Sequence, residues 1–396
     1  MSESNFLAPP GTSRLMQRAL YVGVIFLVLS AIGWFVVPDE FYRAYLMAYL
    51  FWLGVVLGCL AIVMLQFLSG GDWGLVIRRI LEAATRTMPL MAALFIPLLF
   101  GLHNLYPWTN PDTVRRSEAL QHKQLYLNLP FFHGRLVFYF LVWLVLAFLL
   151  SKWSKEQDTT DDPGGLLRRL QVLSGPGIVL YGLTVTFAGV DWIMSLDPEW
   201  FSTIYGMLVM AGQGLAALSV VIAVAVVLAQ HPPLDSVLKP KHFHDLGKLL
   251  LAFVIIWAYF GFSQLLIIWA GNLPEETPWY LRRLQGGYEW MGVALVVLQF
   301  ALPFLMLLSH DLKRASKRLL IVAVVLIVMR FVDLFWLTAP EFSGHLHVSW
   351  LTFATPIGIG GVWLAYFLWE LKGRPLLPLR DPYTEVMLER LAAEAE

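Results

Sequence analysis

The sequence predicts an all-α polytopic membrane protein. Of its 396 residues, 58% are hydrophobic and only 14% are charged, whereas about 25% of the residues of an average soluble domain are charged. Apolar runs of about 20 residues, the length that a helix needs to cross the hydrocarbon core, recur along the chain. These runs must form helices, because unpaired backbone groups are not tolerated in lipid.

Ten segments have the required length and composition. We expect spans at residues 19–37, 43–69, 87–105, 132–151, 171–190, 201–230, 247–270, 289–309, 319–338 and 350–371. The chain then divides into an N-terminal segment (1–18), a membrane domain (19–371) and a C-terminal tail (372–396) that is expected to form a short helix. No remaining segment is long enough for a soluble catalytic domain.

The distribution of basic residues predicts the orientation of these spans. Ten spans place both termini on one side, and most of the 28 Lys and Arg residues lie in the segments on that side. Basic residues concentrate in cytoplasmic loops, so we expect both termini in the cytoplasm. Residues 1–18 lack the apolar region of a signal peptide, so no cleavage is expected.

A ten-residue motif occurs twice. Asp191–Trp200 and Asp333–Phe342 share the pattern Asp-x6-Pro-Glu-aromatic, and Val37–Tyr45 holds a weaker copy without the aspartate. Because an even number of spans separates the two strong copies, the motif predicts parallel internal repeats. Alternatively, Pro-Glu-aromatic is a simple helix-entry turn, with proline in the first helical position.

Composition narrows the range of functions. The single cysteine, Cys59, excludes internal disulfides, thiolate-held iron–sulfur clusters and a c-type haem site. A net charge of zero without a basic patch argues against nucleic acid as a partner. The histidines form neither an obvious haem pair within the spans nor a cluster with carboxylates, so we predict no metal site.

Charged residues within the spans are the main functional candidates, because ionisable groups in a bilayer are costly. Arg330 and Asp333 can pair one helical turn apart. We expect an outer set of proton-handling groups: Asp191, Asp333, Arg330, His345 and His347. The alternative is a buried ion pair that locks span nine to a neighbouring span, through Asp191.

Two further sets follow from the positions of polar side chains. An inner set, at the opposite side of the membrane, consists of Glu82, Arg86, Thr87, His244, Asp245 and Lys248. With the outer set it is expected to form two aqueous half-paths, although interfacial anchoring would give the same pattern. Span seven and its exit combine aromatic and amide side chains that can hold a flat ring, or can serve as an aromatic belt with ordinary polar contacts.

Two long segments carry a family resemblance. Phe51–Trp108 and Trp257–Arg283 ("WAYFGFSQLLIIWAGNLPEETPWYLRR") resemble the ActF family, the haem-free membrane subunits of bacterial alternative complex III, and the likeness extends over residues 19–371. That complex is a quinol:cytochrome c (or other electron acceptor) oxidoreductase. The chain is more distantly similar to NrfD and polysulfide-reductase membrane subunits, which contain four-helix bundles.

The resemblance implies a multi-pass subunit of the bacterial inner membrane that holds no redox cofactor tightly and interacts with quinone or menaquinone. Its implied partners are an NrfD-like membrane subunit, an iron–sulfur subunit and cytochrome c subunits, with lipids and quinol. Its implied role is a second quinol site or a proton path coupled to quinol oxidation. The family motif assigns no individual quinone ligands; from the residue types alone we expect a quinone pocket lined by His103, Tyr259, Ser263, Gln264 and Trp269.

Two other functions remain open. A free-standing secondary transporter would contain broken helices near the midplane, and Pro176 and Pro356 are the obvious candidates for such breaks. A purely structural anchor of a complex would carry no site at all.

Overall fold

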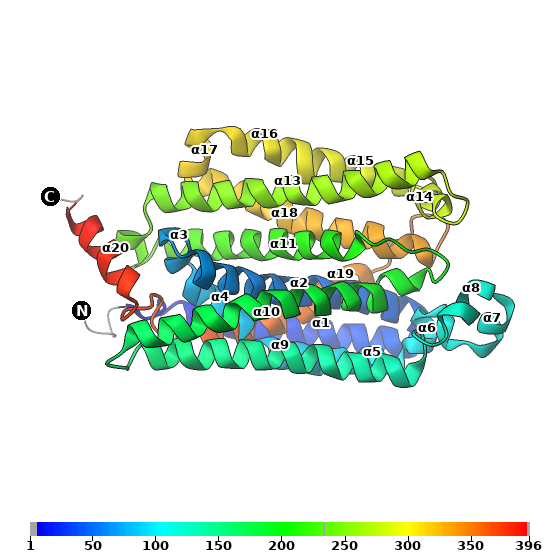
Figure 1. Cartoon of the computed structure of the whole chain (residues 1–396), viewed down its shortest axis with the longest axis horizontal. Helices are drawn as coiled ribbons and strands as arrows, with labels where there is room; N and C mark the ends of the chain where they lie inside the picture. The colour runs from blue at the N-terminus through cyan, green and yellow to red at the C-terminus, as the bar shows by residue number, and fades with distance from the viewer. Residues whose placement is uncertain (1–5, 233, 394–396) are drawn as a thin grey trace.

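The structure, a computed structural model, describes residues 6–232 and 234–393 and contains no strand within them. Ten helical segments are long and apolar enough to cross a membrane, which confirms the expected number of spans (Figure 1). They are α1 (Thr12–Val36), α2 (Pro38–Ser69), α4 with α5 (Arg78–Thr85, Met88–Phe100), α9 (Leu129–Gln157), α10 (Pro163–Trp192), α11 (Tyr205–Leu228), α13 (Pro240–Gly271), α15 with η4 and α16 (Tyr288–Ala294, Leu295–Ala301, Leu302–Leu308), α18 (Ser316–Thr338) and α19 (Leu351–Lys372).

The remaining helices are short. They are α3 (Asp72–Leu75), α6 (Leu102–Leu105), η2 (Pro107–Thr109), α7 (Pro111–Arg116), α8 (Glu118–Lys123), η3 (Met194–Leu196), α12 (Leu234–Val237), α14 (Thr277–Arg283), α17 (His310–Arg314), η5 (Ala339–Glu341) and α20 (Pro382–Ala393). Helices α3, α17 and α20 lie at one end of the bundle, which we call the α20 end. Helices α6, α7, α8 and α14 lie at the other, the α14 end (Figure 1).

The spans pack as two groups of four with a flanking pair. Helices α2, α4–α5, α9 and α10 contact one another in the first group, and α11, α13, α15–α16 and α18 in the second. Helices α2 and α11 pack together between the groups and are buried along most of their length. The flanking pair, α1 and α19, packs against α2. The core of the molecule therefore lies along α2 and α11.

Close packing of the flanking pair depends on small residues. A Cβ on Gly23 or Gly361 would overlap the backbone of the opposite helix. Small residues allow such approach in membrane bundles, where dispersion and interhelical hydrogen bonds hold helices together. Trp52 of α2 adds a hydrogen bond of 2.9 Å to the Pro356 carbonyl of α19.

The third span differs most from the prediction. It was expected at 87–105, but the apolar helical stretch covers Arg78–Phe100 and is interrupted only at Arg86–Thr87, between α4 and α5. All eight residues of α4 are buried, charged ones included. Hydropathy alone misplaced this span because the charges of α4 are neutralised by residues distant in the sequence.

Neither proline proposed as a helix break is one. Helices α10 and α19 continue through Pro176 and Pro356. Instead, the eighth span contains a π-helical segment, η4, immediately before Pro303. Proline has no N–H and its ring crowds the carbonyl four residues earlier, here Gln299, so a wider turn at this point has a physical cause.

Candidate functional site

The two charges inside α18 form a buried pair. Arg330 Nη1 donates to Asp333 Oδ2, and each side chain is only 3% exposed. Gly212 of α11 provides space for the guanidinium, since a Cβ there would overlap it. The predicted pairing at i,i+3 is therefore confirmed.

Asp333 is also bonded across the α13–α18 interface. The indole N–H of Trp257 donates to Asp333 Oδ2 over 3.1 Å. Gln299 lies beside this contact. With its amide oriented to satisfy both neighbours, it donates to the Met329 carbonyl at 2.8 Å and accepts from Trp257 at 3.2 Å. The single N–H of Trp257 is thus shared between the Asp333 carboxylate of α18 and the Gln299 amide oxygen, and Gln299 bonds in turn to the Met329 carbonyl of α18.

The π-helical segment η4 positions Gln299 in this network. Its side chain is fully buried, and it is the residue whose carbonyl Pro303 crowds. π-Helical turns are frequent at functional sites, because they rotate the side chains of one turn relative to the rest of the helix. The same segment contributes Leu295, Val296 and Val297 to the cavity described next.

A cavity of about 840 Å³ lies beside Asp333, between α13, the eighth span and α18. It extends from Tyr280 of α14 to Phe300 of η4 and Phe304 of α16. Its wall is largely apolar. The lining residues that carry a polar group are Trp257, Tyr259, Gln264, Tyr280, Glu289, Asp333 and Trp336. Tyr259 and Phe262 are each 63% exposed, so the cavity opens towards the lipid-facing side of the bundle.

The cavity contains only part of the expected quinone pocket. Tyr259 and Gln264 line it, whereas Ser263 and Trp269 do not, and Trp269 is 74% exposed on the outer surface. His103 lies in α6, beside the first group rather than at the cavity. Three of the five side chains therefore lie outside this cavity.

Gln264 and Tyr280 form a polar pair at the outer end of the cavity. Gln264 Nε2 donates to Tyr280 Oη at 3.4 Å, and its carbonyl oxygen accepts from Ser202 at 3.2 Å. Burial raises the pKa of Tyr280 to about 12. Its hydroxyl is therefore a neutral hydrogen-bonding group at physiological pH.

Asp191, the counterpart of Asp333, has a different environment. It occupies the end of α10, the fourth span of its group, as Asp333 does on α18. Arg135 of α9 binds both carboxylate oxygens at 2.8 Å, and Tyr139 donates to one of them at 2.8 Å. The Arg135 guanidinium also lies over the Tyr126 ring, 3.8 Å from its centroid. Asp191 is closed in by these partners and does not line the cavity.

This arrangement corrects one alternative. Asp191 does not pair with Arg330; its arginine comes from the neighbouring helix of its own group. No local pattern indicates this pairing, because Arg135 and Asp191 are 56 residues apart. Within α18 the Arg330–Asp333 pair is intrahelical, and the bond from Trp257 is the contact that links α18 to α13.

The loops that follow the two aspartates are joined by α14. Arg282 binds Asp197 of the first copy and Glu341 of the second, and Arg283 donates to Glu341 at 2.6 Å. Trp200 and Trp279 stack at 4.5 Å.

The helix-entry interpretation of the motif holds for Pro38, the first residue of α2, but not for Pro198, which lies in a turn, or Pro340, which lies in η5.

The predicted histidines lie in the loop between η5 and α19. His345 and His347 are exposed, and His347 Nε2 is 3.4 Å from Glu40 of α2. The two are outside the cavity beside Asp333. The structure therefore does not gather the five outer residues into one site.

The inner set is divided between two places at the α20 end. Glu82 binds Arg79 at 2.8 Å and accepts from Ser154 at 2.6 Å, while Arg86 binds Glu370 and Thr87 accepts from Trp363. The other three begin α13: the His244 ring contacts that of His310, and Lys248 binds Asp245 at 3.0 Å.

A buried contact with the tail was not predicted. Arg78 donates to Asp381 at 2.7 Å, and both side chains are at most 1% exposed. Asp381 immediately precedes α20, so this ion pair fixes the tail to the bundle. Gln66 and Gln157 complete the hydrogen bonding of the pair. The tail was expected to be helical, and α20 confirms the helix.

Comparison with known proteins adds no assignment: no family model and no curated protein matches the chain.

Proposed function

We propose that the cavity beside Asp333 binds quinol and that Asp333 accepts a proton from it. The observation that carries this proposal is the position of a buried carboxylate, Asp333, in the wall of a largely apolar cavity, held there by Arg330 and Trp257. The second carboxylate of the wall, Glu289, is partly exposed and accepts from the Gly287 N–H. Apolar pockets with a few convergent polar groups are typical ligand sites.

The residues of the cavity have separate roles in this proposal. The Arg330 guanidinium holds the Asp333 carboxylate at the wall of the cavity through their ion pair. Trp257 orients the carboxylate, and Gln299 holds the Trp257 indole. Gln264 and Tyr280 can bond to a polar ring substituent, and the apolar wall holds the ring and its chain. Oxidation of quinol releases two protons and two electrons.

The electrons must leave through a partner, since one cysteine cannot bind a cluster. With the resemblance to the ActF family, this supports a membrane subunit of alternative complex III in a respiratory or photosynthetic chain of the bacterial cell membrane. Its partners would be an NrfD-like subunit, an iron–sulfur subunit and cytochrome c subunits. The equivalent positions of Asp191 and Asp333 support parallel repeats, and the basic residues support cytoplasmic termini.

A structural anchor is the second candidate, and one observation favours it. The ion pair of Asp191 with Arg135 joins α9 to α10, and neither residue lines the cavity beside Asp333. At least one of the two aspartates therefore has a structural role. A free-standing transporter has less support, because α10 and α19 are unbroken at their prolines. It would also purify without c-haem absorbance.

Asp191 therefore supplies a matched control for Asp333. Quinol oxidation is measured with D333N and D191N in complexes of verified composition. We expect D333N to lower the rate by at least about 100-fold, the scale of a lost general base, while assembly is retained. Assembled D191N should keep most of its activity. Unchanged oxidation by D333N would refute the proposed role.

A further inference from the structure

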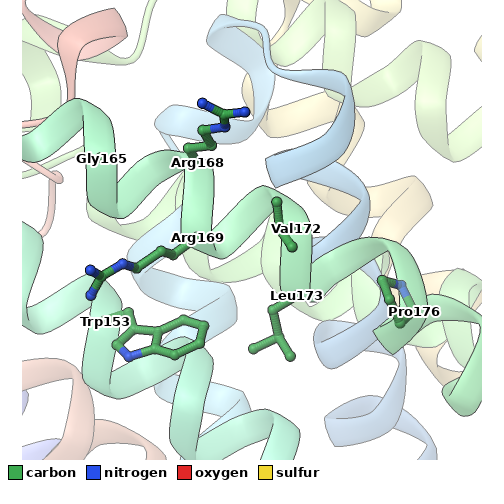
Figure 2. A pocket seen from close by; sticks show the side chains of 7 residues that line it. All are labelled: Trp153, Gly165, Arg168, Arg169, Val172, Leu173 and Pro176. Atoms are coloured by element: carbon green, nitrogen blue, oxygen red, sulfur yellow. The ribbon is translucent and has the colours of Figure 1, made fainter.

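A second cavity lies on the opposite face of the molecule, at the α20 end of α9 and α10. Its volume is about 500 Å³. Figure 2 shows the side chains that line it: Trp153, Gly165, Arg168, Arg169, Val172, Leu173 and Pro176. None of them belongs to the cavity beside Asp333. The proposed function therefore does not involve this site.

The lining residues are ordered by depth. Arg168 and Arg169 lie just before the apolar run that begins at residue 171, at the level of the lipid headgroups. Pro176 lies eight residues further along α10, about 12 Å deeper at the helical rise. Val172, between them, is 67% exposed. One wall thus changes from cationic to apolar along the membrane normal, as a phospholipid does from phosphate to acyl chain.

Both arginines are free to take an external anion. Each is exposed, and neither forms an ion pair with any carboxylate of residues 6–232 or 234–393. Two acidic residues, Glu156 and Asp162, line the adjoining cleft, which they share with Arg169. Asp162 is already engaged, because its carboxylate caps α10 at the Gly165 N–H.

We infer that this cavity binds an anionic phospholipid. Arg169, whose side chain extends towards Trp153 (Figure 2), holds the phosphate, and Arg168, which extends away from Trp153, adds positive charge beside it. Trp153 lies at the interface where its ring is favoured, and Val172, Leu173 and Pro176 contact an acyl chain. Basic pockets between spans at the cytoplasmic side commonly bind such headgroups. A zwitterionic phospholipid would leave the two cations less well neutralised.

The test uses the full chain, purified in mild detergent with any subunits that accompany it. Native mass spectrometry measures the binding of added phosphatidylglycerol and, separately, phosphatidylcholine. R168Q/R169Q is compared with K317Q/R318Q, another adjacent pair of exposed basic residues that starts α18 at the same end. Both variants lose two charges. Inorganic phosphate is added as a competitor to separate headgroup binding from binding of the whole lipid.

We expect R168Q/R169Q to weaken phosphatidylglycerol binding on the order of tenfold, with K317Q/R318Q close to wild type and little effect of phosphate. If both variants weakened phosphatidylglycerol binding equally, binding would depend only on the general surface charge, and the proposed site would be wrong. Unchanged binding in R168Q/R169Q would also overturn it. So would cross-linking of position 153 to another polypeptide in native membranes, since a protein would then occupy the cavity.

Discussion

Trp257 donates its indole N–H to the carboxylate of Asp333 over 3.1 Å, across the interface of α13 and α18. This contact places a carboxylate in a cavity wall and ties two spans together. A buried acid can serve as an acceptor of protons only if its position is maintained, and Trp257 is the residue of a second helix that maintains it.

Removing this donor should therefore affect stability and activity together. W257F keeps the aromatic bulk but leaves Asp333 without its interhelical bond. We expect a loss of about 1–2 kcal/mol, the upper range for hydrogen bonds between membrane helices, and slower quinol oxidation. Thermal unfolding in detergent and the oxidation rate are the measurements. W290F is the control, because Trp290 is 72% exposed; an equal effect of the two variants would contradict the role of Trp257.

The position of the Arg330 guanidinium depends on the absence of a side chain at Gly212. A methyl group there would overlap the guanidinium, so G212A should displace Arg330 from Asp333 at a cost of about 1–3 kcal/mol. The unfolding temperature measures the effect. In G182A the new Cβ would meet only Met210 Sδ, at 3.9 Å. That variant should be tolerated, and similar destabilisation in both would argue against the steric explanation.

Asp191 and Arg135 should behave as a structural pair. R135M leaves a buried carboxylate without its counter-charge, which typically costs about 3–5 kcal/mol. The double variant R135M/D191L removes both charges and should be more stable than R135M alone. Denaturation of the three proteins decides this. If the double variant were less stable than R135M, the Asp191 carboxylate would have another partner that stabilises the protein as much as Arg135 does.

The ion pair of Arg78 with Asp381 should hold the tail against the bundle. In D381N the buried guanidinium loses its charge partner, and residues 373–393 should become accessible to limited proteolysis. The exposed Glu385 of α20 provides the control E385Q, for which the cleavage rate should not change. Equal rates in D381N and wild type would show that other contacts of the tail suffice.

Tyr280 should contribute no pH dependence near neutrality. Burial raises the pKa of Tyr280 to about 12, so the neutral hydroxyl is favoured by folding. The resulting contribution of Tyr280 to the free energy of unfolding is constant below pH 9 and is lost only as the pH rises through the pKa of Tyr280 in the folded protein. Y280F should therefore shift the rate but not the shape of the pH profile of quinol oxidation between pH 5 and 9. A shifted profile would identify Tyr280 as a titrating group.

Much of the fold was predictable because hydropathy and local spacing determine it. The ten spans follow from runs of apolar residues, and the pairing of Arg330 with Asp333 follows from helical periodicity. The third span was misplaced because Arg78 and Arg79 are neutralised by Asp381 and Asp158. Partners separated by so many residues leave no periodic signal.

The site was predictable only in part for the same reason. Gln264 and Tyr259 stood out as polar and aromatic residues within a span. The cavity itself requires a π-helical segment, η4, and three helices that meet in space. Pro303 is the local sign of that segment, but a proline within a span predicts a kink more readily than a π-helix. The burial of Gln299 and its bond to Trp257 are visible only in the folded structure.

Photolabelling with an azidoquinone tests the central claim most directly. The label is applied to membranes with and without excess unlabelled quinone, and modified peptides are identified by mass spectrometry. The proposal predicts adducts within residues 255–304 or 333–337 that unlabelled quinone suppresses. Labelling confined to other subunits, or adducts here that competitor does not reduce, would contradict a quinol site beside Asp333.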